Sequence, residues 1–274
     1  MPTDDSSINL LLGLLSGGLM VLVGMVPAIW WAIKSRTPFY WLLAGAAVWF
    51  VAVAIKGIAY LIIGQPLVDL WKAALPGGVA LILGALYAGS FTGTFEAGLT
   101  LLAGLTWRSW AKEPKRAVAI GLGAGGFEAI CLGGFVLFVV FLAIVAPQVE
   151  AEIEKAFREI QPIASSSSDY LAGPFERSYT ILVHVAFRML ALLAVAKRKW
   201  SFFVYSFLLA TAIDAVASYY MMSKVITTMS AWLVELTLFP FGLISLAIAF
   251  WCYRNWPKEV QQPQQVAVLD VTQP

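Results

Sequence analysis

The chain has 274 residues, of which 60% are hydrophobic and only 12% are charged, and its mean hydropathy is +0.81. A soluble domain carries about 25% charged residues, so this composition excludes an ordinary soluble enzyme and predicts a protein embedded in a lipid bilayer. The net charge of +2 gives no reason to expect a nucleic-acid partner.

A membrane-spanning helix needs about 20 mostly apolar residues. The first such segment follows Asp4 and Asp5 without a basic region and is too long for a signal peptide, so we expect it to stay in the mature protein. We predict an all-α polytopic domain over residues 1–256. Its seven transmembrane helices are expected at residues 8–33, 39–64, 77–106, 117–146, 177–196, 201–223 and 230–253.

Basic residues gather in alternate connections between the predicted spans. The positive-inside rule places these connections in the cytoplasm. We therefore expect a multi-pass protein of the cell membrane with its N-terminus outside and its C-terminus in the cytoplasm. The residues concerned are Lys34, Arg36, Arg108, Lys112, Lys115, Arg116, Lys197, Arg198, Lys199, Arg254 and Lys258.

Two segments outside the spans have a composition of their own. The connection between spans four and five places Val149, Ile153 and Phe157 on one helical stripe, with glutamates between them. This pattern predicts an amphipathic helix on the outer surface, acting as a lid or surface element, with partner binding as the alternative. Residues 257–274 are rich in proline and glutamine and are expected to form a disordered cytoplasmic tail.

Several ionisable residues lie inside the predicted spans, where each costs at least ~2.5–3.5 kcal/mol on insertion scales. The four deepest come from four different spans and are Glu96, Glu128, His184 and Asp214. Each lies about 10 to 13 residues from the cytoplasmic end of its span, roughly 15–20 Å deep at 1.5 Å per residue. We interpret this common level as a shared polar site near the middle of the membrane, with separate structural hydrogen bonds as the alternative.

Three kinds of chemistry are open to these residues. In hydrolysis, Glu128 or Glu96 would activate water and a neutral His184 would donate to the oxyanion. A divalent metal is the second alternative, but the chain has one histidine and no HExxH motif, so we expect no cofactor. The third is a proton or ion path, or a structural core in which Lys56 and Arg188 neutralise the acids.

The glycine-rich stretch at residues 121–126 lies inside the fourth span. A dinucleotide-binding loop needs a preceding strand, which an apolar helix does not provide. The pairs Gly89/Gly93 and Gly121/Gly125 have the small-xxx-small spacing that lets helix backbones approach closely. We therefore interpret these glycines as helix-packing residues.

Four motifs occur in the order of a known family. The stretch Gly121-Leu-Gly-Ala-Gly-Gly-Phe-Glu-Ala-Ile130 is similar to the "G-x-G-H-G-x-x-E-A" stretch of the YhfC-type intramembrane peptidases. These peptidases resemble the CAAX-processing and PrsW-like glutamic membrane peptidases. Residues 88–100 resemble that family's "A-G-x-F-E-E-x-x-R", residues 176–184 its "E-R-x-x-x-x-x-x-H", and residues 210–214 its last "H-x-x-x-D". The resemblance covers about residues 80–220 and implies the family's seven-span fold.

The sequence departs from the family's motifs at four positions: Ala97, Thr100, Ala124 and Ala210. Two hypotheses follow. One is a glutamic-type hydrolase of a membrane-associated peptide or protein, with catalytic Glu96, Glu128, His184 and Asp214. In it, Arg177 or Arg188 would orient a substrate carboxylate, and Glu176 would be a further substrate-binding residue. The other is a degenerate member that binds a membrane protein or lipid, or is a subunit of a larger membrane complex.

Overall fold

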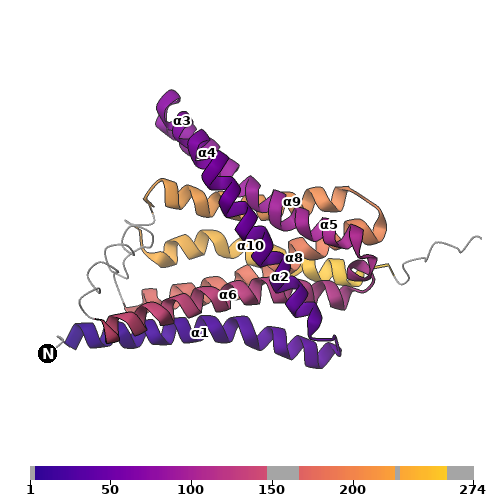
Figure 1. The fold of residues 1–274 in the computed structure, drawn as a ribbon, viewed down its shortest axis with the longest axis horizontal. Coiled ribbons are helices and arrows are strands. Elements are labelled where there is room, and N and C mark those ends of the chain that lie inside the picture. The colour runs from indigo at the N-terminus through magenta and orange to yellow at the C-terminus, as the bar shows by residue number, and fades with distance from the viewer. Residues whose placement is uncertain (1–3, 147–166, 226–228, 258–274) are drawn as a thin grey trace, which may run out of the picture.

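The computed structural model describes residues 4–146, 167–225 and 229–257, and its described part is helical without a strand (Figure 1). The predicted surface helix in residues 147–166 and the predicted tail beyond residue 257 lie outside the described residues. The elements are α1 (Asp4–Ser35), α2 (Tyr40–Ala59), η1 (Tyr60–Gly64), α3 (Gln65–Ala74), α4 (Gly77–Thr92), η2 (Gly93–Ala97), α5 (Gly98–Thr106), η3 (Arg108–Ala111), α6 (Pro114–Val145), η5 (Ser167–Leu171), α8 (Ala172–Lys197), α9 (Ser201–Met222) and α10 (Ala231–Arg254).

Seven of the described helical segments are long and apolar enough to cross a membrane, which confirms the predicted number. The second runs from Tyr40 to Ala74, because η1 is a π turn that joins α2 to α3 without a break. The third runs from Gly77 to Thr106 and contains a second π turn, η2. The second span is thus longer than the sequence pattern predicts.

Local sequence accounts for several helix ends. Pro114 lies in the first turn of α6, where its missing N–H costs no hydrogen bond. Pro76 caps the start of α4 in an extended conformation. Arg36 and Arg198, which follow α1 and α8, both have a φ of 52°. This left-handed conformation is typical of a residue just past a helix end.

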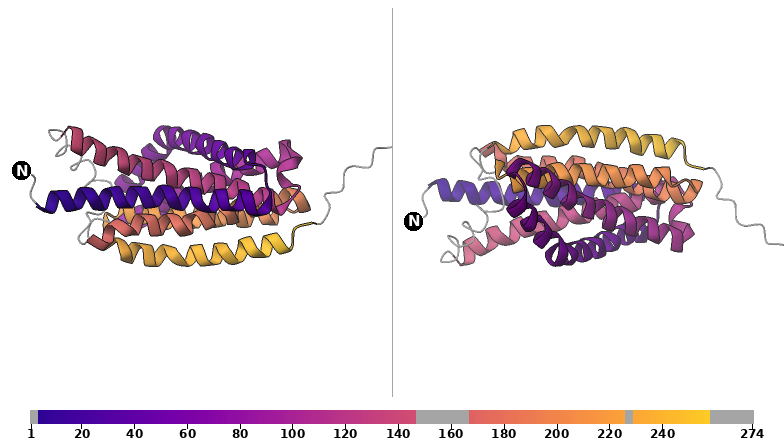
Figure 2. Two further views of the ribbon diagram at one scale, coloured as in Figure 1. Left: turned by 90° about the horizontal axis from the view of Figure 1, so that it is seen from below. Right: turned by 90° about the horizontal axis from the view of Figure 1, so that it is seen from above.

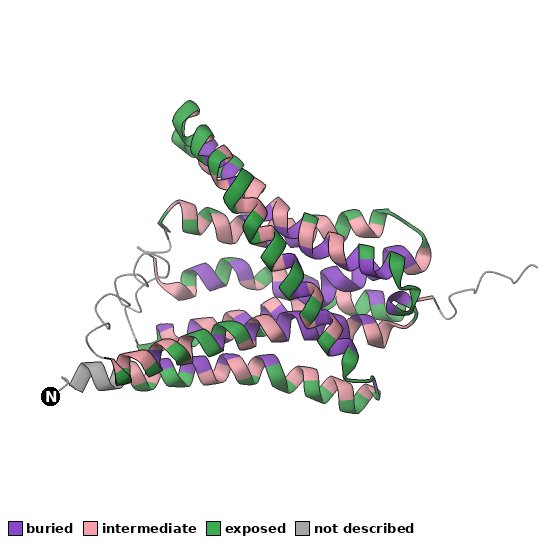
Figure 3. Ribbon diagram, in the orientation of Figure 1, coloured by how far each residue is buried: buried purple, intermediate pink, exposed green. Residues whose placement is uncertain are grey.

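Helix α8 is the centre of the fold. It packs against α6, α9 and α10, and it is the most deeply buried of the spans (Figure 3). Its residues are buried on nearly all sides, as expected for a helix enclosed by others, and the buried ones include Arg177, His184 and Arg188. Figure 1 shows α2 crossing the other helices obliquely, so that α3 and the start of α4 extend beyond the bundle. Figure 2 shows α2 and α10 on opposite faces of the bundle.

The glycine pairs pack as the sequence predicts. A Cβ added at Gly125 would lie 3.0 Å from the Cα of Ile181 and 3.0 Å from the Cβ of His184, so α6 and α8 approach closely there. Gly121 lies against Val185 one turn away, and Gly89 of α4 lies against the backbone of α9. These contacts bring the polar residues of α6 and α8 within hydrogen-bonding distance of each other.

Candidate functional site

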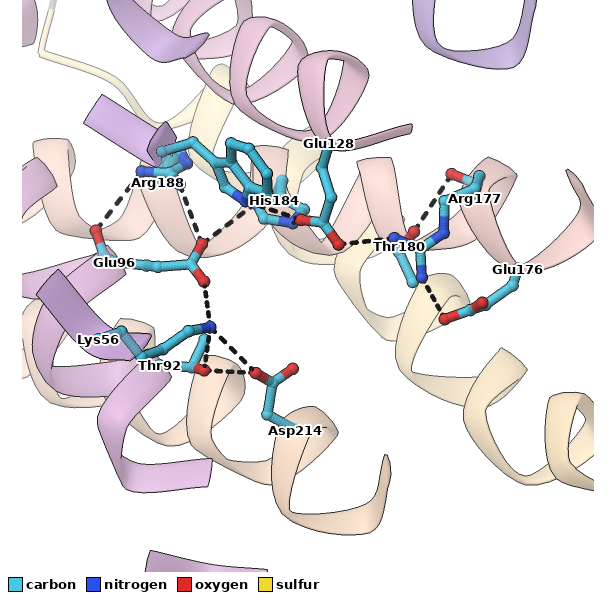
Figure 4. Close-up of polar contacts among 11 residues, drawn as sticks. Lys56, Thr92, Glu96, Glu128, Glu176, Arg177, Thr180, His184, Arg188 and Asp214 are labelled. Atoms are coloured by element: carbon cyan, nitrogen blue, oxygen red, sulfur yellow. Dashed lines mark hydrogen bonds and ion pairs between the residues drawn. The ribbon is translucent and has the colours of Figure 1, made fainter. Parts of the chain in front are cut away.

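A cavity of about 320 Å³ lies where α2, α6, α8 and α9 meet the π turn η2. Ionisable side chains from five different elements line it, and Figure 4 shows how they lie relative to one another. They are Lys56, Glu96, Glu128, Glu176, Arg177, His184 and Asp214. The four residues that the sequence places at one depth therefore face a common cavity.

Glu128 of α6 is held by three donors. The indole N–H of Trp49 donates to Oε2 over 2.8 Å, and Nε2 of His184 lies 2.8 Å from the same oxygen. Arg177 donates to Oε1 over 2.6 Å. Its other terminal nitrogen pairs with Glu176. These donors, from α2 and α8, fix the orientation of the carboxylate, and the glutamate side chain remains 22% exposed.

Glu96 is positioned by the π turn η2 and is almost completely buried, with 3% of its side chain exposed. Two cations hold it from opposite sides. Lys56 Nζ lies 2.8 Å from Oε1, and a terminal nitrogen of Arg188 lies 3.2 Å from Oε2. Nδ1 of His184 is 3.8 Å from Oε2 and has no hydrogen-bond partner among the described residues. His184 thus lies between the carboxylates of Glu128 and Glu96.

Asp214 of α9 is the most open carboxylate of the network, with 41% of its side chain exposed. The Thr92 hydroxyl donates to its Oδ2, and that hydroxyl itself accepts a hydrogen bond from Lys56 over 3.0 Å. Lys56 Nζ also lies 3.7 Å from Oδ2. Lys56 therefore connects the buried Glu96 to the exposed Asp214.

The structure joins every residue proposed from the sequence into one continuous network (Figure 4). Sequence reasoning named Lys56 only as a neutralising charge, although it pairs with both Glu96 and Asp214. It missed Trp49 and Thr92. A neutral tryptophan or threonine in an apolar span costs little free energy to insert into the membrane, so it does not stand out in the sequence. Glu235 lies elsewhere and accepts a hydrogen bond from Tyr179.

A protein-family model described as YhfC intramembrane metalloprotease matches residues 19–238, well over half of the chain. The chain belongs to this family. Comparisons with curated proteins and with solved structures find no match. The family expected from the sequence motifs is thereby confirmed.

The positions at which this YhfC-family chain departs from the motifs are closely packed. Ala97, Ala124 and Ala210 have no exposed surface, and Ala210 lines the cavity. Thr100 is also fully buried, and its hydroxyl accepts a hydrogen bond from Arg188 over 2.5 Å. The guanidinium of Arg188, from α8, therefore lies against the Thr100 side chain.

The family description names a metalloprotease, which raises the question of whether side chains around the cavity could serve as ligands of a metal ion. No group of three or more His, Cys, Asp or Glu side chains within the described ranges could hold a metal ion. Nε2 of His184, the single histidine, lies against Glu128, and Lys56 and Arg188 already pair with Glu96. Protein cations occupy the places beside Glu96 and Glu128 where a metal would bind, so the described residues do not fit a metal site.

Proposed function

We propose that this YhfC-family protein hydrolyses a peptide bond of a membrane-embedded substrate, using a carboxylate base and a lysine donor in place of a metal. The observation that carries the proposal is the pair formed by Asp214 and Lys56 at the cavity. Asp214 has the most exposed carboxylate there, and the Lys56 side chain is 23% exposed beside it. A base and an oxyanion donor are thus available within one cavity.

The proposed reaction uses only side chains of this chain. Asp214 takes a proton from a water molecule whose oxygen adds to the substrate carbonyl carbon. The ammonium of Lys56 stabilises the resulting oxyanion. The proton then passes from Asp214 to the leaving nitrogen as the carbon–nitrogen bond breaks. Thr92 orients Asp214 by donating to Oδ2, which leaves Oδ1 for the water.

Glu128, His184 and Glu96 have positioning roles in this proposal. Three donors already contact the carboxylate oxygens of Glu128, whereas Thr92 and Lys56 contact Asp214 at Oδ2. His184 directs Nε2 at Glu128, and its Nδ1 is buried. Glu96 holds Lys56 in place. The base expected from the sequence, a glutamate, is therefore replaced in our proposal by the aspartate.

The test is cleavage of labelled single-span peptides by the protein reconstituted in liposomes. Asp214→Asn should lower the rate by about 10²–10⁴-fold, the usual contribution of a general base. Asp69→Asn is the matched control, because Asp69 is a 58% exposed carboxylate outside the cavity. Activity should persist after chelation of metals. Full activity of Asp214→Asn, or activity that is lost on chelation and restored by Zn²⁺, would contradict the proposal.

A second candidate function is binding without catalysis. It is favoured by the charge pairing of the network, in which Lys56, Arg177 and Arg188 each already pair with an acid. A degenerate member of the family would use the cavity to hold a segment of a partner membrane protein. Detergent extraction would then recover a stoichiometric partner, and no peptide would be cleaved.

A further inference from the structure

A second cavity lies away from the polar network, between α8, α9 and α10. Its volume is about 710 Å³, and the side chains that line it are aliphatic or aromatic. Leu190 of α8 lines it, with Leu208 on the α9 side and Ile244 and Ala247 on the α10 side. Helices α9 and α10 each pack extensively on α8 but touch each other little, which leaves a groove between them.

One end of the groove is closed by aromatic rings and carries a positive charge. Phe202 of α9 and Trp251 of α10 meet there with their ring centroids 5.9 Å apart. The ammonium of Lys197 lies 5.5 Å from the Phe202 centroid and 5.7 Å from the Trp251 centroid. Both rings attract the cation, so Lys197 is held at the groove's end.

Further cations surround this end. Arg198 and Lys199 are exposed in the turn between α8 and α9, and Arg254 is exposed at the end of α10. Together with Lys197 they form a basic cluster without a carboxylate within ion-pair distance among the described residues. An unpaired basic cluster at the membrane surface attracts the phosphate of an anionic lipid.

We propose that this groove binds one anionic phospholipid, with an acyl chain between α9 and α10 and its phosphate at the basic cluster. The apolar walls match hydrocarbon, and the charge at the end matches a phosphate. A second copy of the chain would fit less well. Two copies with the same orientation in the membrane would bring their basic clusters together, and like charges repel. The site is separate from the proposed active cavity and does not depend on its chemistry.

The test is native mass spectrometry of the full chain released from nanodiscs of equal dioleoyl-phosphatidylglycerol and dioleoyl-phosphatidylcholine. The wild type should retain one phosphatidylglycerol in preference to phosphatidylcholine. Lys197→Gln and Arg254→Gln should each weaken this retention roughly fivefold, since a basic residue near the surface contributes about 1 kcal/mol. The matched control is Lys34→Gln, because Lys34 also lies over a tryptophan, 5.1 Å from the Trp30 centroid, but outside the groove.

Filling the groove tests where the acyl chain lies. Ala247→Phe should abolish retention of phosphatidylglycerol, and Leu208→Trp provides a second filling variant in case the first does not fold. Equal retention of both lipids by the wild type would overturn the proposal, as would an equal effect of Lys34→Gln. Unchanged retention in folded filling variants would also overturn it. A dimer that dissociates on filling would assign the groove to a second copy instead.

Discussion

Arg188 holds Glu96 in the interior and is the largest fully buried side chain in the described structure. Arg188→Met should lower the free energy of unfolding by about 3–5 kcal/mol, because it removes one of two cations from a buried carboxylate. Denaturant unfolding in mixed micelles measures this change. The matched control is Arg116→Met, whose partner Glu113 is partly exposed, with an expected loss of about 1 kcal/mol or less. Equal losses in the two variants would contradict the assigned role of Arg188.

At the scale of single residues, the sequence predicted which ionisable groups share a cavity but not how they pair. The cost of a charge in an apolar span made Glu96, Glu128 and Asp214 recognisable, and their equal depth indicated a common site. The pairing depends on how each helix is rotated about its axis and on side-chain rotamers. Spacing along the chain does not determine these. Lys56 therefore could not be assigned to Glu96 and Asp214 from the sequence alone.

At the scale of elements, the contact of α6 with α8 sets the distance between Glu128 and His184. Gly125→Ala should destabilise the protein by about 1–3 kcal/mol and lower the proposed hydrolysis, because the new Cβ would lie 3.0 Å from atoms of α8 and push the helices apart. Gly134→Ala is the matched control on the same helix, since nothing lies within 4 Å of its added Cβ. That variant should gain about 0.5–1 kcal/mol from helix propensity. Thermal unfolding in detergent distinguishes the two variants, and a stabilised Gly125→Ala would contradict the packing role.

The helices themselves were largely predictable, because apolar length and proline positions mark where spans begin and end. The π turns were not. Each of η1 and η2 alters the hydrogen bonding of a single turn, and the residues around Glu96 have no composition that distinguishes a π turn from an α turn. The position of Glu96 therefore depends on a feature that only the structure reveals.

At the scale of the whole molecule, the odd number of candidate spans among the described residues leads us to expect the start of α1 and the end of α10 on opposite sides of the membrane. The described basic connections, which follow α1, α5, α8 and α10, all lie at one end of the bundle, because successive spans run in opposite directions. Retaining these charges in the cytoplasm is favoured during insertion. We therefore expect the turn at Gly77 to face the outside and Lys112 to face the cytoplasm.

Cysteine labelling of intact cells tests this orientation. In a background with Cys131→Ala and Cys252→Ala, Gly77→Cys should react with a membrane-impermeant maleimide. Lys112→Cys should react only after the cells are permeabilised. Both positions are exposed, so a difference in labelling reports the side of the membrane rather than burial. The reverse pattern would place the basic cluster at Lys197 outside the cell. The anionic phospholipid bound there could then not come from the cytoplasmic leaflet.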